Sequence, residues 1–202
     1  MFITFEGGEG TGKTTLIKRI FDILKDNYDV IMTREPGGSK IAEVIRNVVL
    51  NPVYKGITPR TEALLIAAAR TQHLDDKILP ALASGKIVLC DRYLDSSLAY
   101  QACARKLGFD FVLAINAYAN EHLPDLTFYI DLEPEVGISR IANREKYDRL
   151  DQETLTYHHL VRKGYLEVVK RYPNRIIVID GHKSIDEITA IIMNTIIQYQ
   201  KQ

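Results

Sequence analysis

The sequence predicts an α/β fold with an open, all-parallel sheet of five strands flanked by helices. Short apolar runs recur along its 202 residues, and longer stretches with helical spacing separate them. Several of these runs are apolar throughout, which is typical of strands buried on both faces. Alternating strands and helices form a parallel sheet through right-handed crossovers. The length suits one compact domain, so we expect residues 1–202 to form a single unit.

The strands are expected where the apolar runs lie, and the helices where apolar residues recur at intervals of three and four. The first helix illustrates the pattern, because Leu16, Ile17 and Ile20 share one face. The expected strands are Phe2–Glu6, Asp29–Thr33, Ile87–Asp91, Leu126–Leu132 and Arg175–Asp180. The expected helices are Thr14–Lys25, Ile41–Leu50, Arg60–Leu82, Ser96–Lys106, Phe111–Asn120, Pro134–Arg144, Gln152–Arg171 and Ser184–Gln200.

Composition and charge exclude several classes of protein. Lysine plus arginine and aspartate plus glutamate number 26 each, so the net charge is zero, which argues against a general nucleic-acid-binding protein. Cys90 and Cys103 lack the spacing of a zinc site or a disulfide framework, which favours the reducing cytoplasm. The chain shows no secretory signal pattern and no apolar run long enough for a membrane span.

A phosphate-binding loop follows the first strand. Gly7, Gly12, Lys13 and Thr14 satisfy the pattern G-x-x-x-x-G-K-[ST] between a strand and a helix. In such a loop backbone N–H groups surround the phosphates, the lysine reaches the β and γ oxygens, and the threonine ligates Mg²⁺. The alternative is a glycine-rich turn without a ligand. The expected ATP-binding residues here are Gly7, Gly8, Glu9, Gly10, Thr11, Gly12, Lys13, Thr14 and Thr15.

The segment "IVLCDRY" provides the second nucleotide-binding signal. Asp91 ends an apolar strand that we expect beside the loop, where it could bind the metal through water. Arg92 follows it, where hydrolytic ATPases usually carry a second acid. A cation at this position suits a second phosphate, so the motifs favour transfer to an acceptor. The N-K-x-D segment that reads guanine is missing.

The sequence resembles the bacterial thymidylate kinases over essentially its whole length. The segments that carry the resemblance are, in order, "FEGGEGTGKTT", "TREPGG", "RTEALLIAAAR", "CDRYLDSSLAYQ", "LPDLTFYIDLEPEVGISRI" and "DRLDQE". The resemblance implies the P-loop nucleoside monophosphate kinase fold with a short lid. It also implies a cytosolic homodimer that uses Mg²⁺ and transfers the γ-phosphoryl of ATP to dTMP, giving dTDP and ADP.

The resemblance also assigns the residues that recognise dTMP. Arg70 corresponds to the arginine at the thymine carbonyl edge and Arg92 to the arginine on the dTMP phosphate. A planar guanidinium suits both tasks because it meets oxygens in pairs. Ser97 and Gln101 correspond to residues that read the base, and they are four apart on a predicted helix. Tyr100 matches a residue that packs on the deoxyribose, with plain core packing as the alternative.

Further positions correspond to the sugar, the phosphates and the donor base. Glu9 matches an acid near the sugar 3'-hydroxyl and the bridging metal, and Glu35 is expected to organise arginines and the acceptor phosphate. Arg34 faces the acceptor, and Arg46 either lines its pocket or is solvated. Arg140 corresponds to the residue that stacks on adenine.

One position departs from the family pattern. The family has phenylalanine within "LLFAA", where the ring stacks on thymine, and this chain has Ile66. Base–aromatic stacking is worth roughly 1–3 kcal/mol in nucleic-acid complexes, so we expect weaker acceptor binding.

Gly10 occupies the loop position at which some family members carry a catalytic arginine. The resemblance places this chain in the subgroup that supplies arginines from the lid instead. The segment "NREKYDRLD" is rich in cations, and we expect a lid at about residues 142–151 with Arg149 and Arg144 as catalytic residues beside Lys13 and Arg92. The alternative is a solvated helix end.

Two other functions remain open on the residues alone. A deoxynucleoside kinase would use Glu35 as a general base on a neutral hydroxyl, although the Asp91–Arg92–Tyr93 triplet and the lid pattern speak against it. A nucleotide-binding module without catalysis would have lost Lys13 or Arg92, and both are present.

Overall fold

A five-stranded, all-parallel sheet forms the centre of the molecule in the computed structural model, which describes residues 1–54, 56–142 and 149–201. The strand order is β2-β3-β1-β4-β5, and every neighbouring pair is parallel. The strands are β1 (Phe2–Gly7), β2 (Val30–Arg34), β3 (Ile87–Asp91), β4 (Leu126–Asp131) and β5 (Ile176–Asp180). This confirms the predicted fold class.

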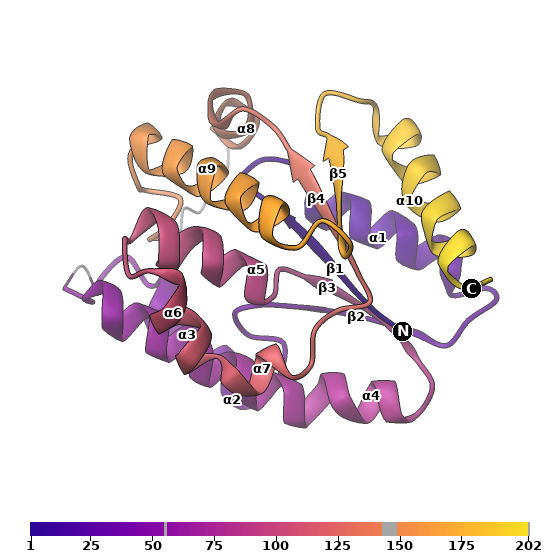
Figure 1. Cartoon of the computed structure of the whole chain (residues 1–202), viewed down its shortest axis with the longest axis horizontal. Helices are drawn as coiled ribbons and strands as arrows, with labels where there is room; N and C mark the ends of the chain where they lie inside the picture. Colours follow the sequence, from indigo (N-terminus) through magenta and orange to yellow (C-terminus); the bar gives the residue numbers. More distant parts are fainter. Residues whose placement is uncertain (55, 143–148, 202) are drawn as a thin grey trace.

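One face of the sheet is covered by α1 (Lys13–Leu24) and α10 (Ile185–Tyr199), which lie together on one side of it in Figure 1. The core there contains Ile20 of α1 and Ile192 of α10 against Phe5 and Phe128 of the sheet. These residues are fully buried, as expected for strands that read as continuous apolar runs.

The remaining helices cover the opposite face and the ends of the sheet, and α9 crosses this side in Figure 1. They are α2 (Lys40–Leu50), α3 (Pro59–His73), η1 (Leu74–Ile78), α4 (Leu79–Ala83), α5 (Leu94–Ser97), η2 (Leu98–Ala104), α6 (Phe109–Ile115), α7 (Ala117–Asn120), α8 (Pro134–Ile141) and α9 (Leu155–Arg171). No helix in this described part of the chain combines the length and apolarity needed to cross a membrane.

Three predicted helices differ from the observed ones. The helix expected over Ser96–Lys106 is α5 followed by the π-helical segment η2. The helix expected over Arg60–Leu82 is a continuous helical run in which η1 is a π-helical segment between α3 and α4. The helix expected over Phe111–Asn120 breaks at Asn116, where φ is −112° and ψ is 22°. The Asn116 side chain donates to the carbonyl of Val112 at 2.8 Å and accepts from Arg70 at 2.6 Å, so tertiary contacts accompany the break.

Candidate active site

A cavity of about 650 Å³ opens at the carboxyl ends of β1, β2 and β3. Loops that leave parallel strands at one edge converge there, which is where open α/β sheets bind ligands. The predicted residues in the cavity lining are Glu9, Gly10, Thr11, Gly12, Lys13, Thr14, Thr15, Arg34, Glu35, Arg46, Ile66, Arg70, Asp91, Arg92, Ser97, Tyr100 and Gln101. Ser96 also lines the cavity and was not predicted from the sequence.

The phosphate-binding loop is held around the side chain of Lys13. Its Nζ donates to the carbonyls of Gly7 at 3.0 Å and Gly8 at 2.8 Å, and to Thr11 Oγ1 at 3.2 Å. Gly12 adopts the left-handed conformation and starts α1, so the helix N-terminus faces the loop. The loop is therefore ordered around one buried ammonium group, with helix N–H groups beside it.

Gly10 packs too closely against α8 to carry a side chain. Its φ is 69°, and a Cβ atom there would lie 1.8 Å from the carbonyl oxygen of Gly137. Backbone atoms cannot yield as the end of a side chain can, so this arrangement of the loop excludes an arginine at position 10.

Thr14 and Asp91 form a pair of hard oxygen donors at the end of the loop. Thr14 Oγ1 donates to Asp91 Oδ2 at 2.9 Å, and both residues line the cavity. Mg²⁺ is usually held by one or two such protein groups together with substrate phosphates and water. The donor set at this pair fits the predicted ion.

Arg92 connects the phosphate-binding loop to α9, which carries Tyr165. Its guanidinium donates to the Gly7 carbonyl at 2.8 Å, to Tyr165 Oη at 3.0 Å and to Glu9 Oε1 at 2.5 Å. The residue has a φ of 70°, a conformation that few non-glycine residues adopt and that clusters at functional sites. These contacts hold the arginine at the edge of the cavity.

Glu9 stays ionised beside this arginine. Burial disfavours its charge, but attraction from Arg92 and then Lys13, with a hydrogen bond from Tyr100, lowers its pKa to about 2. Tyr100 Oη donates to Glu9 Oε1 at 2.9 Å, while its ring meets Tyr157 and Tyr165 edge-on. Tyr100 thus both lines the cavity and packs in the core.

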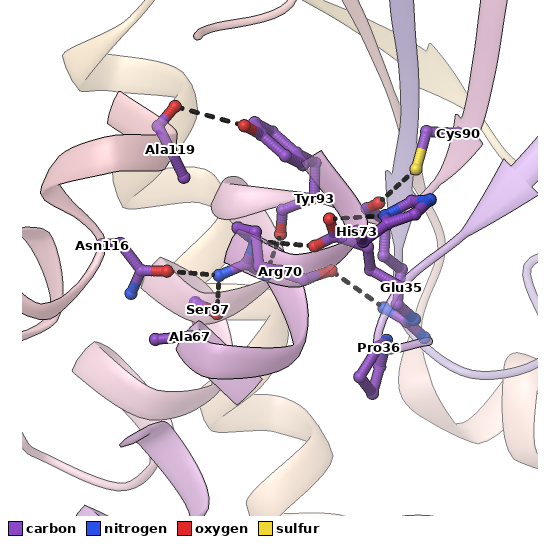
Figure 2. Close-up of polar contacts among 12 residues, drawn as sticks. Glu35, Pro36, Ala67, Arg70, His73, Cys90, Tyr93, Ser97, Asn116 and Ala119 are labelled. Carbon is purple, nitrogen blue, oxygen red and sulfur yellow. Dashed lines mark hydrogen bonds and ion pairs between the residues drawn. The ribbon is translucent and has the colours of Figure 1, made fainter. Parts of the chain in front are cut away.

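Arg70 lies in a buried network at the far end of the cavity (Figure 2). Its Nε donates to Glu35 Oε2 at 2.6 Å, and its two terminal nitrogens donate to Ser97 Oγ, Asn116 Oδ1 and the carbonyl of Tyr93. Only 2% of the Arg70 side chain is exposed. The guanidinium is therefore fixed in orientation before any ligand arrives.

Glu35 organises this network. Its other oxygen meets His73 Nδ1 at 3.0 Å, and His73 Nε2 meets Thr33 Oγ1 at 2.6 Å. The histidine ring thus connects the Glu35 carboxyl group to the Thr33 hydroxyl. The predicted role of Glu35 as an organiser of arginines agrees with its contact to Arg70.

Two further arginines surround the turn after β2. Arg34 is exposed and pairs with Glu43 at 3.1 Å, whereas Arg46 donates to the Pro36 carbonyl at 2.7 Å. Both line the cavity. Arg46 therefore lies at the pocket, the first of the two positions considered for it.

Of the predicted lid and adenine arginines, the two that the structure describes, Arg140 and Arg149, are outside the cavity lining. Arg140 is exposed on α8 and is outside the cavity lining. Arg144 lies outside the described residues. Arg149 donates to the Val49 carbonyl at 2.8 Å and to Glu62 Oε2 at 2.5 Å, although its neighbours Leu150 and Asp151 line the cavity.

The sequence reasoning missed several polar residues of the site. Glu6 accepts from Ser96 Oγ at 2.6 Å and Tyr165 Oη at 3.0 Å, and burial followed by repulsion from Asp95 raises its pKa to about 7. Asn116 anchors Arg70. The only signal for Glu6 was an acid at the end of an otherwise apolar strand, and Asn116 gave none.

Comparisons with known proteins agree with one another. The Thymidylate kinase family model matches residues 5–192. A thymidylate kinase of Acholeplasma laidlawii is 56% identical over 201 residues, covering 98% of this chain and 99% of the relative. One from a Geobacillus species is 51% identical over 194 residues, covering 94% and 92%. The crystal structure of thymidylate kinase from Ehrlichia chaffeensis matches with a TM-score of 0.80 at 30% identity, covering 97% of each chain.

Proposed function

The chain belongs to the thymidylate kinase family, and we propose that it transfers the γ-phosphoryl group of ATP to dTMP, giving dTDP and ADP for dTTP synthesis. The observation that carries this proposal is one cavity with two differently equipped ends. Lys13 and Thr14 lie at the end that suits a triphosphate, and Arg70 and Gln101 lie at the end that suits a base. Arg92 connects the two groups, because it donates to Gly7 and Glu9 of the loop and to Ser96 beside Ser97.

The reaction requires that two anions meet in line and that the charge of the transferring group be spread. The acceptor phosphate has a second pKa near ~6, so it is mostly a dianion at neutral pH and needs no general base. Lys13 binds the donor phosphates, and Arg92 binds the acceptor phosphate. Thr14 and Asp91 would hold Mg²⁺, which neutralises charge on the donor phosphates when bound.

An acceptor screen tests this function. The purified protein is supplied with ATP and Mg²⁺, and ADP is followed with dTMP, dUMP, dGMP, dCMP, AMP and thymidine in turn. We expect the highest kcat/KM with dTMP. Turnover with thymidine alone would instead identify a nucleoside kinase with Glu35 as base, and no turnover with any acceptor would identify a binding module.

The first prediction concerns the pH dependence of ATP use. Burial, followed by the positive charge of Arg92, lowers the pKa of Lys13 to about 8 in the ligand-free protein. Lys13 therefore loses its charge as the pH rises through this value, and kcat/KM for ATP should fall above about pH 8. Steady-state kinetics at saturating dTMP measure it. In Lys13→Arg the guanidinium stays protonated, so a lower but flat alkaline limb is expected; a flat limb in the unaltered protein would contradict the assignment.

A second prediction concerns the lid at about residues 142–151, of which Asn143–Asp148 lies outside the described residues. Since Gly10 admits no side chain, we assign the missing cation to Arg149, together with Arg144. In this role Arg149 exchanges Glu62 for the transferring phosphate. Arg149→Ala should lower kcat by about 10²-fold or more with a smaller change in KM. A loss confined to KM would remove Arg149 from the transition state.

A third prediction concerns the thymine contact. Ile66 is buried beside Val49 and Leu50 and lines the cavity. A phenylalanine ring there can cover more of the base, so Ile66→Phe should lower the KM for dTMP by severalfold. Kinetics at saturating ATP measure it, with Ile66→Leu as a control that keeps the volume without the ring. An unchanged or higher KM would contradict a stacking role.

A second copy of the chain is proposed to cover an apolar stripe on α2. Ile41, Val44 and Val48 are spaced by three and four residues and are 53%, 62% and 39% exposed. Leu64 on the adjoining α3 is 51% exposed. A stripe of this kind suits a two-fold helical interface, and sedimentation velocity tests the homodimer.

Both cysteines are free, in keeping with a cytoplasmic location.

A further inference from the structure

Glu62 is a buried carboxylate on α3 that lies behind the cavity without lining it. Its Oε1 accepts from Gln101 Nε2 at 2.9 Å and from Arg105 Nε at 3.3 Å, and its Oε2 accepts from Arg105 at 3.1 Å and Arg149 at 2.5 Å. Only 1% of its side chain is exposed. The proposed transfer reaction gives this group no direct task, yet it contacts a residue assigned to read the base.

The charge of Glu62 determines which way the Gln101 amide faces. Burial opposes ionisation, but attraction from Arg105 and the hydrogen bonds from Arg149, Gln101 and Arg105 lower the pKa of Glu62. An ionised carboxylate only accepts, so the NH₂ group of Gln101 must face it. The Gln101 carbonyl oxygen has no donor among the residues that the structure describes, and Gln101 lines the cavity.

Hydrogen-bond donors complete this end of the cavity. Four of the five N–H groups of Arg70 are used within the protein, which leaves one. Ser97 accepts from Arg70, so its own hydroxyl hydrogen is available. The cavity therefore offers fixed donors from Arg70 and Ser97 beside a fixed acceptor on Gln101.

This pattern matches one class of pyrimidine. Thymine and uracil present a carbonyl oxygen at position 4 and an N–H at position 3, whereas cytosine presents an amino group and an unprotonated nitrogen there. We propose that Glu62 is a positioning residue for base selection, which fixes the Gln101 carbonyl toward N3–H and so rejects cytosine. This rests on the proposed function. Guanine presents the same oxygen and N–H pair. This hydrogen-bonding arrangement therefore distinguishes thymine from cytosine, and purines are excluded by size.

The substitution Glu62→Gln tests the proposal because it should reverse the amide. Oε2 accepts the two shorter arginine bonds, at 3.1 and 2.5 Å, and Oε1 only one at 3.3 Å. Before Arg149 leaves for the transferring phosphate, the oxygen of the new amide is therefore held at the Oε2 position and its NH₂ group faces Gln101. Gln101 must then turn its own oxygen toward position 62 and its NH₂ group toward the base. The ratio of kcat/KM for dTMP to that for dCMP should fall about ten- to a hundredfold.

Two further variants separate this effect from general damage. In the exchange variant, Glu62→Gln together with Gln101→Glu, the carboxylate at position 101 accepts from the amide at position 62 and from the base. The ratio of kcat/KM for dTMP to that for dCMP should therefore recover. Arg105→Lys loosens the same cluster but keeps a positive charge beside Glu62 and leaves the Glu62–Gln101 contact in place, so melting temperature should fall while the ratio stays unchanged.

The outcomes are distinct. An unaltered protein that does not prefer dTMP to dCMP refutes the proposed function itself. If the unaltered protein prefers dTMP, the role of Glu62 is overturned when the Glu62→Gln variant keeps that preference. It is also overturned when the Arg105→Lys variant loses the preference to the same extent. If Glu62→Gln does not fold, the exchange variant decides: dTMP preference supports the role, and loss of preference in a folded exchange variant overturns it.

Discussion

Replacing Arg92 with methionine should lower kcat by about 10³-fold, because no other described cation is held at the junction of donor and acceptor in the same way. The guanidinium is fixed by the Gly7 carbonyl, Tyr165 and Glu9, so it needs no reorganisation to meet the acceptor phosphate that we propose binds there. Methionine keeps the length of the side chain and faces the same backbone constraint at φ 70°. The change therefore removes the charge and keeps the backbone constraint, and because it also removes the partner of Glu9, melting temperature is measured beside kcat.

The controls separate chemistry from binding. Arg92→Lys keeps a positive charge but loses the planar fork, so its kcat should lie between those of the unaltered protein and of Arg92→Met. ATP affinity, measured by equilibrium binding, should change far less than kcat, because Lys13 holds the donor side. A loss of less than tenfold in kcat for Arg92→Met would place the acceptor phosphate elsewhere.

The sequence predicted the strands of the sheet, their parallel direction and the residues of the phosphate-binding loop because these depend on local patterns. Apolar runs buried on both faces identify strands, and the spacing of Gly7, Gly12, Lys13 and Thr14 identifies the loop. The resemblance supplied Arg70, Arg92, Ser97 and Gln101, and the structure gathers all of them around one cavity.

The residues that hold these groups in place could not be predicted in the same way. Glu62 contacts Gln101 across 39 positions, and Tyr165 reaches Glu6 across 159. Periodicity reports which face of an element is buried, but it does not say which polar side chain of another element meets that face. The close approach of Gly10 to Gly137 likewise depends on how α8 packs against the loop, and the sequence showed only that a glycine stands there.

The break at Asn116 shows the same limit within a predicted helix. The pattern over Phe111–Asn120 favours a helix, and the segment is helical on both sides of the break. The contacts of Asn116 with Val112 and Arg70 combine a local bond with one across 46 positions. Only the second of these is outside the reach of local propensity, and it belongs to the site.

Replacing Arg70 with methionine should cost about 3–5 kcal/mol of unfolding free energy, since it leaves Glu35 buried without its cation. Glu35 is 1% exposed in its side chain, and water cannot replace the lost donor there. The substitution also strips a donor from Asn116 and from the Tyr93 carbonyl, both of them buried. Urea denaturation measures the loss, and a cost below about 1 kcal/mol would mean that the pair is already solvated.

A double substitution measures how much of that loss of unfolding free energy comes from the buried Glu35 carboxylate without its arginine. Glu35→Gln in the Arg70→Met background removes the buried carboxylate that has lost its arginine, so the double variant should be more stable than Arg70→Met alone. Ligand linkage then distinguishes a stability role from recognition. Saturating dTMP at about 100 times its Kd should stabilise the unaltered protein by about 2.7 kcal/mol, and the double variant by much less, because the donor for the thymine carbonyl is gone even where the fold is restored.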